Sequence, residues 1–181
     1  MVATFARWKG HETFLKALAM LPASLRVRGY IVGGPVYETS GSQTSASELR
    51  ARVRALGLED RVGLTGFVPD ASKAMRALDI VVHASTDPEP FGLVIAEAMA
   101  CRKPVVVSRA GGAAELIEPG VNALAFNPGD ASELARRIEE LARDVNLRER
   151  LGRAGRAMAE QRFHRRRMAS ELAPIYQSLV H

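Results

Sequence analysis

The stretch IVVHASTDPEPFGLVIAEAMACRKPVVVS, residues 80–108, decides the fold class of this chain. It begins and ends with short β-branched runs at 80–83 and 105–108, and apolar residues recur at helical spacing over 92–101. Short continuous runs of such residues are typical of strands that are buried on both faces. Two such strands joined by a helix form the unit from which parallel sheets are built. This stretch therefore predicts an α/β protein.

The same alternation extends through the rest of the chain. The expected strands are 2–5, 28–32, 62–64, 80–83, 105–108 and 123–126. The expected helices are 11–21, 45–57, 71–78, 92–101, 112–118, 131–143, 146–161 and 165–180, and the polar stretch 35–47 is expected to be a surface loop. The pattern predicts a Rossmann-like, doubly wound parallel sheet of about six strands, with extra C-terminal helices.

Composition excludes several classes of protein. The 181 residues are 47% hydrophobic and 25% charged, which favours one globular domain over a disordered chain. No apolar run approaches the roughly 18 residues that a membrane span requires. The single cysteine, Cys101, excludes an internal disulfide framework and a multi-cysteine zinc site. The first residues do not resemble a signal peptide, so we expect a cytoplasmic protein.

The net charge of +5 raises the possibility of an anionic partner. From residue 131 onward 11 arginines face 7 acidic residues, so this region carries +4 of the total. Basic and acidic residues alternate there at helical spacing, which is typical of solvated helix faces. We therefore expect no nucleic-acid partner. Docking of the arginine-rich segment 162–167 on the inner face of a membrane is an alternative.

In a doubly wound sheet, ligands bind outside the carboxyl ends of the strands. Lys9, at the start of the first helix, could neutralise a phosphate beside free backbone N–H groups. The pair Gly33-Gly34 allows a ligand to approach the backbone closely, but it lacks the third glycine of a dinucleotide-binding motif. The segment 66–68, Gly-Phe-Val, offers a small surface that suits a flat base.

The segment 87–100 carries two glutamates, Glu89 and Glu97, around a loop-to-helix junction. Paired catalytic carboxylates lie roughly 5–9.5 Å apart, whereas eight helical residues span about 12 Å. The spacing therefore favours two separate ligand contacts. Glu97 has apolar neighbours, so we expect it to be largely buried and to need a partner such as a ligand hydroxyl. The N–H groups near Gly92 and Leu93 suit a phosphate.

Together these segments resemble the C-terminal, donor-binding domain of GT-B type, retaining glycosyltransferases of group 1 (family four). The resemblance covers residues 2 to about 179, and its most specific part is the motif of two glutamates separated by seven residues, Glu89 and Glu97. It continues through 98–101 and 103–106. The supporting segments are Lys9-Gly10, Gly33-Gly34, Gly66-Phe67-Val68 and Gly111-Gly112 with Glu115.

The resemblance implies a hexosyltransferase that transfers a sugar from a UDP- or GDP-linked donor to an acceptor hydroxyl, with no metal or other cofactor. It assigns Glu89 to the sugar hydroxyls, Lys9 to the diphosphate and Glu97 to the ribose, and makes Glu89 and Lys9 the catalytic residues. The donor-binding residues that it implies are Thr4, Arg7, Lys9, Gly33, Gly34, Gly66, Phe67, Val68, Glu89, Phe91, Gly92, Leu93, Val94 and Glu97.

Two positions depart from the family pattern. Thr4 stands where the family has an arginine of the phosphate clamp, so either Thr4 or the nearby Arg7 completes the clamp. Arg102 stands where a glycine usually ends the helix, and a left-handed conformation there would cost roughly 1 kcal/mol.

The resemblance also implies that residues 1–181 are the donor half of a two-domain enzyme. The missing partner is an N-terminal, acceptor-binding domain, on which the terminal helix 163–181 is expected to pack. We expect the chain alone to bind donor weakly and to transfer nothing. The alternative, which Thr4 favours, is a non-catalytic module that binds nucleotide sugars or regulates another protein.

Overall fold

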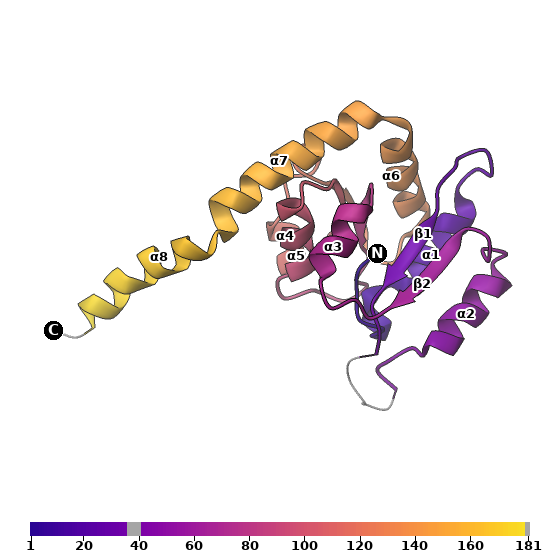
Figure 1. The fold of residues 1–181 in the computed structure, drawn as a ribbon, viewed down its shortest axis with the longest axis horizontal. Helices are drawn as coiled ribbons and strands as arrows, with labels where there is room; N and C mark the ends of the chain where they lie inside the picture. Colours follow the sequence, from indigo (N-terminus) through magenta and orange to yellow (C-terminus); the bar gives the residue numbers. More distant parts are fainter. Residues whose placement is uncertain (36–40, 180–181) are drawn as a thin grey trace.

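The computed structural model describes residues 1–35 and 41–179, and Figure 1 shows an α/β fold with a long helical arm at its C-terminus. Within these residues there are five strands, and every pairing between them is parallel. They are β1 Gly29–Val32, β2 Val62–Gly66, β3 Val81–His83, β4 Val105–Ser108 and β5 Leu124–Phe126. The strands form two ladders, β1-β2 and β3-β4-β5.

Helices separate the strands as the sequence predicts. They are α1 His11–Met20, α2 Ala46–Ala55, α3 Ala71–Ala77, α4 Leu93–Ala100, α5 Gly112–Glu115, α6 Ala131–Arg143, α7 Val145–Phe163 and α8 Arg165–Ser178. Side-chain caps fix several helix starts: Asp130 accepts the Glu133 N–H at 2.8 Å at the start of α6, and Ser45 forms a capping box with Glu48 at the start of α2. The predicted α/β class with parallel strands is confirmed.

The predicted first strand, 2–5, is not a strand in the structure. Val2 makes a single parallel bridge to Val32, and the N–H groups of Ala3 and Phe5 donate to the carbonyls of Val32 and Gly34 at 3.0 and 3.1 Å. These bonds all lie on the side of the segment that faces β1. No backbone bond to β3 is present in the described part of the chain, so the two ladders are not joined and the expected six strands are five.

The predicted loop 35–47 is only partly visible, because residues 36–40 lie outside the described residues. Its later part is held against the N-terminal segment. The Arg7 N–H donates to the Ser42 carbonyl at 3.0 Å, and the Thr44 N–H donates to the Phe5 carbonyl at 2.8 Å. The capping box at Ser45 then starts α2, earlier than residue 47.

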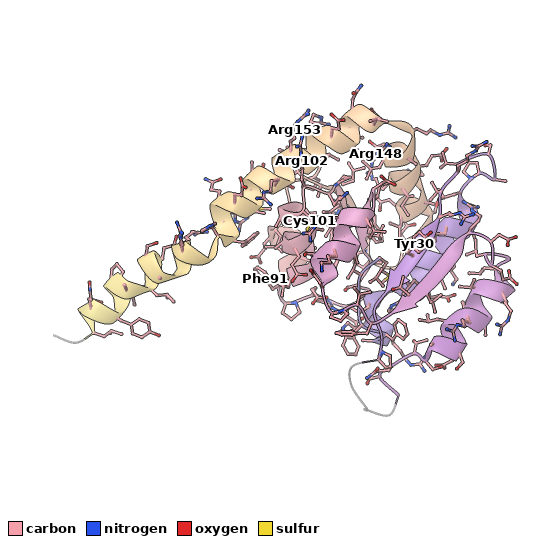
Figure 2. The ribbon with its side chains drawn as sticks, in the orientation of Figure 1. Tyr30, Phe91, Cys101, Arg102, Arg148 and Arg153 are labelled. Carbon is pink, nitrogen blue, oxygen red and sulfur yellow. The ribbon has the colours of Figure 1, made fainter. Side chains whose placement is uncertain are left out.

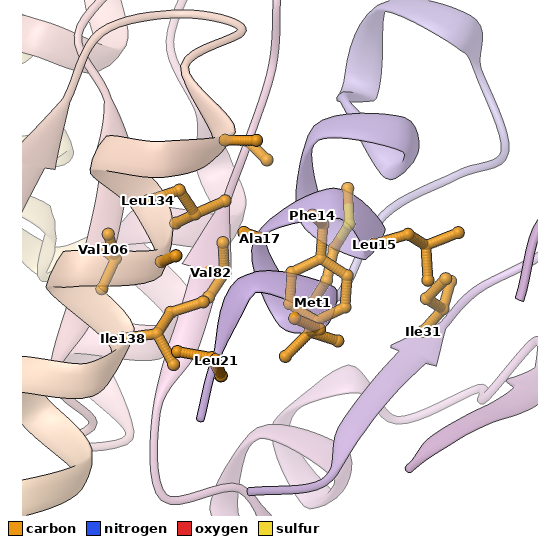
Figure 3. Close-up of a cluster of buried hydrophobic side chains, with 14 of the residues drawn as sticks. Met1, Phe14, Leu15, Ala17, Leu21, Ile31, Val82, Val106, Leu134 and Ile138 are labelled. Carbon is orange, nitrogen blue, oxygen red and sulfur yellow. The ribbon is translucent and has the colours of Figure 1, made fainter. Parts of the chain in front are cut away.

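Buried side chains cover both faces of the sheet, as a doubly wound fold requires. On one face α1 and α6 pack over β1, β3 and β4, and Figure 3 shows Phe14, Leu134 and Val106 in this cluster. On the other face α4 packs over β4 through alternate residues of the strand, Val105 and Val107, and α7 packs against α4. All four residues of β4 are buried, which explains the continuous apolar run in the sequence.

The last helix, α8, runs away from the body of the molecule (Figure 1). Four large apolar residues in or next to it are 42–74% exposed: Leu172, Ile175, Tyr176 and Leu179. None of the described helices is both long and apolar enough to cross a membrane.

Arg102, which stands where the family pattern has a glycine, adopts a left-handed conformation with φ of 58°. The Lys103 N–H donates to the Ala98 carbonyl at 3.0 Å, so the chain reverses at Arg102 and ends α4 in the manner of a glycine cap. The side chain at this position costs about 1 kcal/mol relative to an unstrained turn.

His11 makes the stability of the fold depend on pH. Its ring is 3% exposed and packs edge-on against Phe5 with ring centroids 5.7 Å apart. Burial, reinforced by the positive charge of Lys9, lowers the His11 pKa to about 4. The unfolded chain takes up this proton near pH 6.5, so folding loses free energy as the pH falls from 6.5 towards 4.

We expect the His11→Leu variant to lose part of the pH dependence of stability. Between pH 8 and pH 5, His11 should contribute about 2 kcal/mol to the fall in wild-type unfolding free energy. Urea unfolding at pH 8, 6.5 and 5 gives the free energy of unfolding of both proteins. The two proteins are compared by the slope of this free energy against pH, and the difference between the slopes isolates His11 from the other titrating groups. Equal slopes would contradict a buried, neutral His11.

Candidate functional site

A pocket of about 190 Å³ lies between the N-terminal segment and the carboxyl end of β3. Its lining comes from residues 1–4, from Lys9, from 82–85 and from the start of α4. The sequence-predicted residues that it brings together are Thr4, Lys9, Glu89, Gly92, Leu93 and Val94.

The centre of the pocket is an ion pair between Lys9 and Glu89, which lie 80 residues apart in the sequence. Lys9 Nζ donates to Glu89 Oε2 at 2.6 Å, and Ser85 Oγ donates to the same oxygen at 2.9 Å. Burial alone raises the pKa of Glu89, but the bonds from Lys9 and Ser85 outweigh it and bring the pKa below its usual value. Glu89 is therefore an anion at neutral pH.

The fold brings these two residues together through close backbone contacts. Gly10, in the left-handed conformation with φ of 73°, lies against the end of β3, so close that a Cβ would fall 1.8 Å from the Ala84 oxygen. The loop that carries Glu89 bridges to Gly111, and a Cβ on Gly112 would fall 2.0 Å from the Pro90 oxygen. Only glycine fits at these contacts.

The N-terminus of α4 opens on the same pocket. Gly92, with φ of 84°, is the residue before the helix, and the Ile95 N–H donates to its carbonyl at 2.9 Å. The N–H groups of Leu93 and Val94 have no backbone acceptor within the described residues. Free N–H groups at a helix start attract an anion.

A second group of predicted residues lies beside the pocket, at the ends of β1 and β2. The Gly33 N–H donates to the Gly66 carbonyl at 3.0 Å, and a Cβ on Gly33 would fall 1.9 Å from the Ala3 oxygen. Gly34 packs against Phe67, whose side chain is 72% exposed, and Val68 is half-buried. These residues form an open surface, not part of the enclosed pocket.

Glu97 is exposed, which corrects the expectation that it is largely buried. Its sequence neighbours Ala96 and Ala98 are buried, but successive helical residues point about 100° apart. Apolar neighbours in sequence therefore do not share its face of α4. Partial burial still raises the Glu97 pKa above its usual value.

The structure separates Thr4 from Arg7. Thr4 lines the pocket, whereas the Arg7 Nε donates to the Gly41 carbonyl at 2.9 Å and its guanidinium lies 3.6 Å from Glu48. The Phe91 ring also points elsewhere, because it packs edge-on against Phe163 at 5.6 Å. Of the two candidates for the clamp position, only Thr4 reaches the pocket.

Two further residues of the pocket, His83 and Ser85, were not predicted from the sequence. Both are buried, and Ser85 Oγ lies 3.2 Å from His83 Nε2. The available signal was a polar residue, His83, that ends an otherwise apolar strand at the carboxyl edge of the sheet.

A larger pocket of about 430 Å³ lies near the amino ends of β1 and β3, and Tyr30 and Arg148, labelled in Figure 2, line it. It contains none of the predicted site residues. Within residues 1–35 and 41–179, no group of three or more histidine, cysteine, aspartate or glutamate side chains could hold a metal ion.

Comparison with known proteins identifies the family. Residues 1–158 match the family model described as glycosyl transferases group 1. The mannosyltransferase LpcC of lipopolysaccharide core biosynthesis from Rhizobium leguminosarum bv. viciae is 34% identical over 172 residues, which are 95% of this chain and 48% of that protein. The chain spans about half the length of the curated relatives that it matches.

Two solved structures share the fold. The crystal structure of HepE from Anabaena with UDP and glucose has a TM-score of 0.87 and 40% identity, over 98% of this chain and 48% of that one. The C-terminal domain of LpcC, a group 1 family protein from Francisella tularensis, has a TM-score of 0.77 and 26% identity, over 91% of this chain and 85% of that one. The chain belongs to the glycosyl transferases of group 1 and matches the C-terminal domain of that family.

Proposed function

We propose that this chain is the donor-binding half of a retaining glycosyltransferase that uses a UDP- or GDP-linked sugar. The observation that carries the proposal is the Lys9–Glu89 pair, at 2.6 Å, beside the free N–H groups at the start of α4. The Lys9 ammonium and the free helix N–H groups suit the negative charge of a diphosphate, and the Glu89 carboxylate can accept hydrogen bonds from the hydroxyls of an attached sugar. The crystal structures of the relative HepE with UDP and with UDP-glucose support this choice of ligand.

The pocket favours departure of the nucleoside diphosphate. Breaking the bond between the sugar and the diphosphate leaves negative charge on the phosphate oxygens. The Lys9 ammonium and the N–H groups of Leu93 and Val94, which line the same pocket, would stabilise that charge, which is electrostatic catalysis. Lys9 is the only lysine or arginine side chain among the described residues that line the pocket, and we propose that no metal is required.

Glu89 is proposed to orient the sugar. The two hydrogen bonds from Lys9 and Ser85 both end on Oε2, and Oε1 has no hydrogen-bond partner among the described residues. Oε1 can therefore accept a hydrogen bond from a sugar hydroxyl. The nucleoside would extend along the outside of the sheet, with its ribose at Glu97 and its base over the backbone of 66–68. The exposure of Glu97 and Phe67 leaves both accessible to a ligand.

The acceptor hydroxyl is proposed to come from a site on an N-terminal domain. The helix α8 supports this arrangement, since its exposed apolar residues Leu172, Ile175 and Tyr176 have no core to pack on within the described residues. We propose that the region 163–181 packs on that domain.

Isothermal titration calorimetry with UDP-glucose, UDP, GDP and ADP, in the presence of EDTA, tests the proposal. We expect binding of at least one nucleoside diphosphate or its sugar, and no transfer to any acceptor by the chain alone. Turnover by the isolated chain would contradict the proposal that a separate N-terminal domain binds the acceptor. A lack of binding at millimolar ligand would overturn the donor site. A regulatory module would bind alike but stay inactive even when joined to a matching N-terminal half.

Glu97→Gln is expected to weaken the binding of every nucleoside diphosphate by about tenfold, because the ribose is common to all of them and a carboxylate accepts more strongly than an amide. Inorganic diphosphate, which has no ribose, should bind this variant as it binds wild type. Glu160→Gln, at another exposed glutamate, which lies on α7 and pairs with Arg156, is the control. Equal weakening with inorganic diphosphate would contradict the ribose assignment.

A further inference from the structure

We propose that His83, acting through Ser85, is a positioning residue that holds Glu89 in the orientation needed to bind the sugar. This inference rests on the proposed function and extends it to two residues outside the glutamate motif. His83 ends β3 and is 4% exposed, and it lines the same pocket as Ser85 and Glu89.

The three side chains lie in a row. His83 Nε2 is 3.2 Å from Ser85 Oγ, which in turn is 2.9 Å from Glu89 Oε2. The direct distance from His83 Nε2 to Glu89 Oε2 is 3.6 Å, too long for a good hydrogen bond. Ser85 is therefore the link between the ring and the carboxylate.

The direction of each hydrogen bond follows from the charge of Glu89. An ionised carboxylate can only accept, so the single hydroxyl proton of Ser85 is donated to Glu89. Ser85 Oγ then has only lone pairs to offer the ring, and His83 must donate its Nε2 proton. The His83 ring is thus the neutral tautomer that carries its proton on Nε2, and burial, which lowers the His83 pKa, favours the neutral form.

The rest of the surroundings keep this row in place. The Ser108 hydroxyl donates to the Ser85 carbonyl at 2.6 Å and fixes the backbone at that residue. His83 Nδ1 has no hydrogen-bond partner among the described residues, so the ring makes its polar contact on the Ser85 side alone. The charged groups that face His83 are Glu89 and Lys9.

These bonds determine which carboxylate oxygen of Glu89 faces the pocket. The donors Lys9 and Ser85 meet on Oε2, which locks the carboxylate and presents Oε1 to the pocket. Loss of the His83 donor frees Ser85 to rotate, and Glu89 is then held by Lys9 alone. Because Glu89 is assigned to the sugar, the loss should appear with the nucleotide sugar and not with the bare nucleotide.

The experiment compares UDP and UDP-glucose affinity in wild type, His83→Leu, His83→Gln, Ser85→Ala and the double variant His83→Leu/Ser85→Ala. We expect His83→Leu to weaken UDP-glucose binding about tenfold while UDP binding changes less than about twofold. The His83→Gln variant keeps a side-chain donor near the Nε2 position and should restore most of the affinity. Ser85→Ala should match His83→Leu, and the double variant should be no weaker than either, since both break the same chain.

Nitrogen NMR of the His83 ring in the ligand-free protein gives a second readout that needs neither binding nor a variant. At pH 7 the proton should be on Nε2, and a proton on Nδ1 would overturn the proposal. Equal losses for UDP and UDP-glucose in His83→Leu, or additive losses in the double variant, would also overturn it. If the wild-type protein carries the proton on Nε2 but binds neither UDP nor UDP-glucose, the hydrogen bonds from His83 through Ser85 to Glu89 are supported. The same result would overturn the proposed donor site.

Discussion

Replacing Lys9 with methionine is expected to weaken UDP-glucose binding about a hundredfold, or about 2.7 kcal/mol. Lys9 is the cation of the pocket, and its Nζ lies 2.6 Å from Glu89 Oε2. The variant loses the charge that would face the diphosphate. It also leaves the anionic Glu89, whose side chain is only 15% exposed, without its counterion beside an anionic ligand. Both effects act in the same direction.

Two further variants separate the causes of this loss. Lys16→Met removes an exposed lysine from α1 that pairs with Glu12 at 3.2 Å, and it should bind as wild type does. The double variant Lys9→Met/Glu89→Gln removes both charges and should recover thermal stability but not affinity. Calorimetry with UDP and UDP-glucose measures the affinities. A fall of less than about threefold in Lys9→Met would contradict the assignment of Lys9 to the diphosphate.

Local patterns in the sequence are enough to predict most of the fold. The apolar run at β4 is buried on both faces, and glycine and proline mark the ends of several helices, so strands and helices could be located without knowledge of their packing. The segment 2–5 shows where local sequence patterns fail to predict a strand. Its residues have strand propensity, but a strand also requires partners on the sheet, and the described segment has a single bridge to β1 and no backbone bond to β3.

The candidate site is predictable only in part, because it is assembled from distant segments. Topology alone indicates that Lys9 and Glu89 both lie at the carboxyl edge of the sheet, and the structure places them in contact. The apolar sequence neighbours of Glu97 led to a wrong prediction of its burial, which depends on which face of α4 packs inward. The choice between Thr4 and Arg7 depends on the contacts of Arg7 with Glu48 and Gly41, which no local pattern shows.

Gly10→Ala is expected to destabilise the fold by more than about 4 kcal/mol. The new Cβ would fall 1.8 Å from the Ala84 oxygen, a backbone atom at the end of β3 that no side-chain rotation can move. The adjacent contact is also rigid, because the Thr86 N–H donates to the Trp8 carbonyl at 2.7 Å. Relief of the clash must therefore move Lys9 away from the strand end that carries the pocket.

Gly129→Ala separates this steric effect from backbone strain. Gly129 has φ of 78°, close to the 73° of Gly10, but nothing lies within 4 Å of its Cβ position. Both variants incur the left-handed penalty of about 1 kcal/mol, and only Gly10→Ala adds the clash. Urea unfolding and UDP-glucose calorimetry should show loss of both stability and binding in Gly10→Ala, and unchanged affinity in Gly129→Ala. Similar stabilities of the two variants would mean that the contact between Gly10 and Ala84 does not hold Lys9 in the pocket.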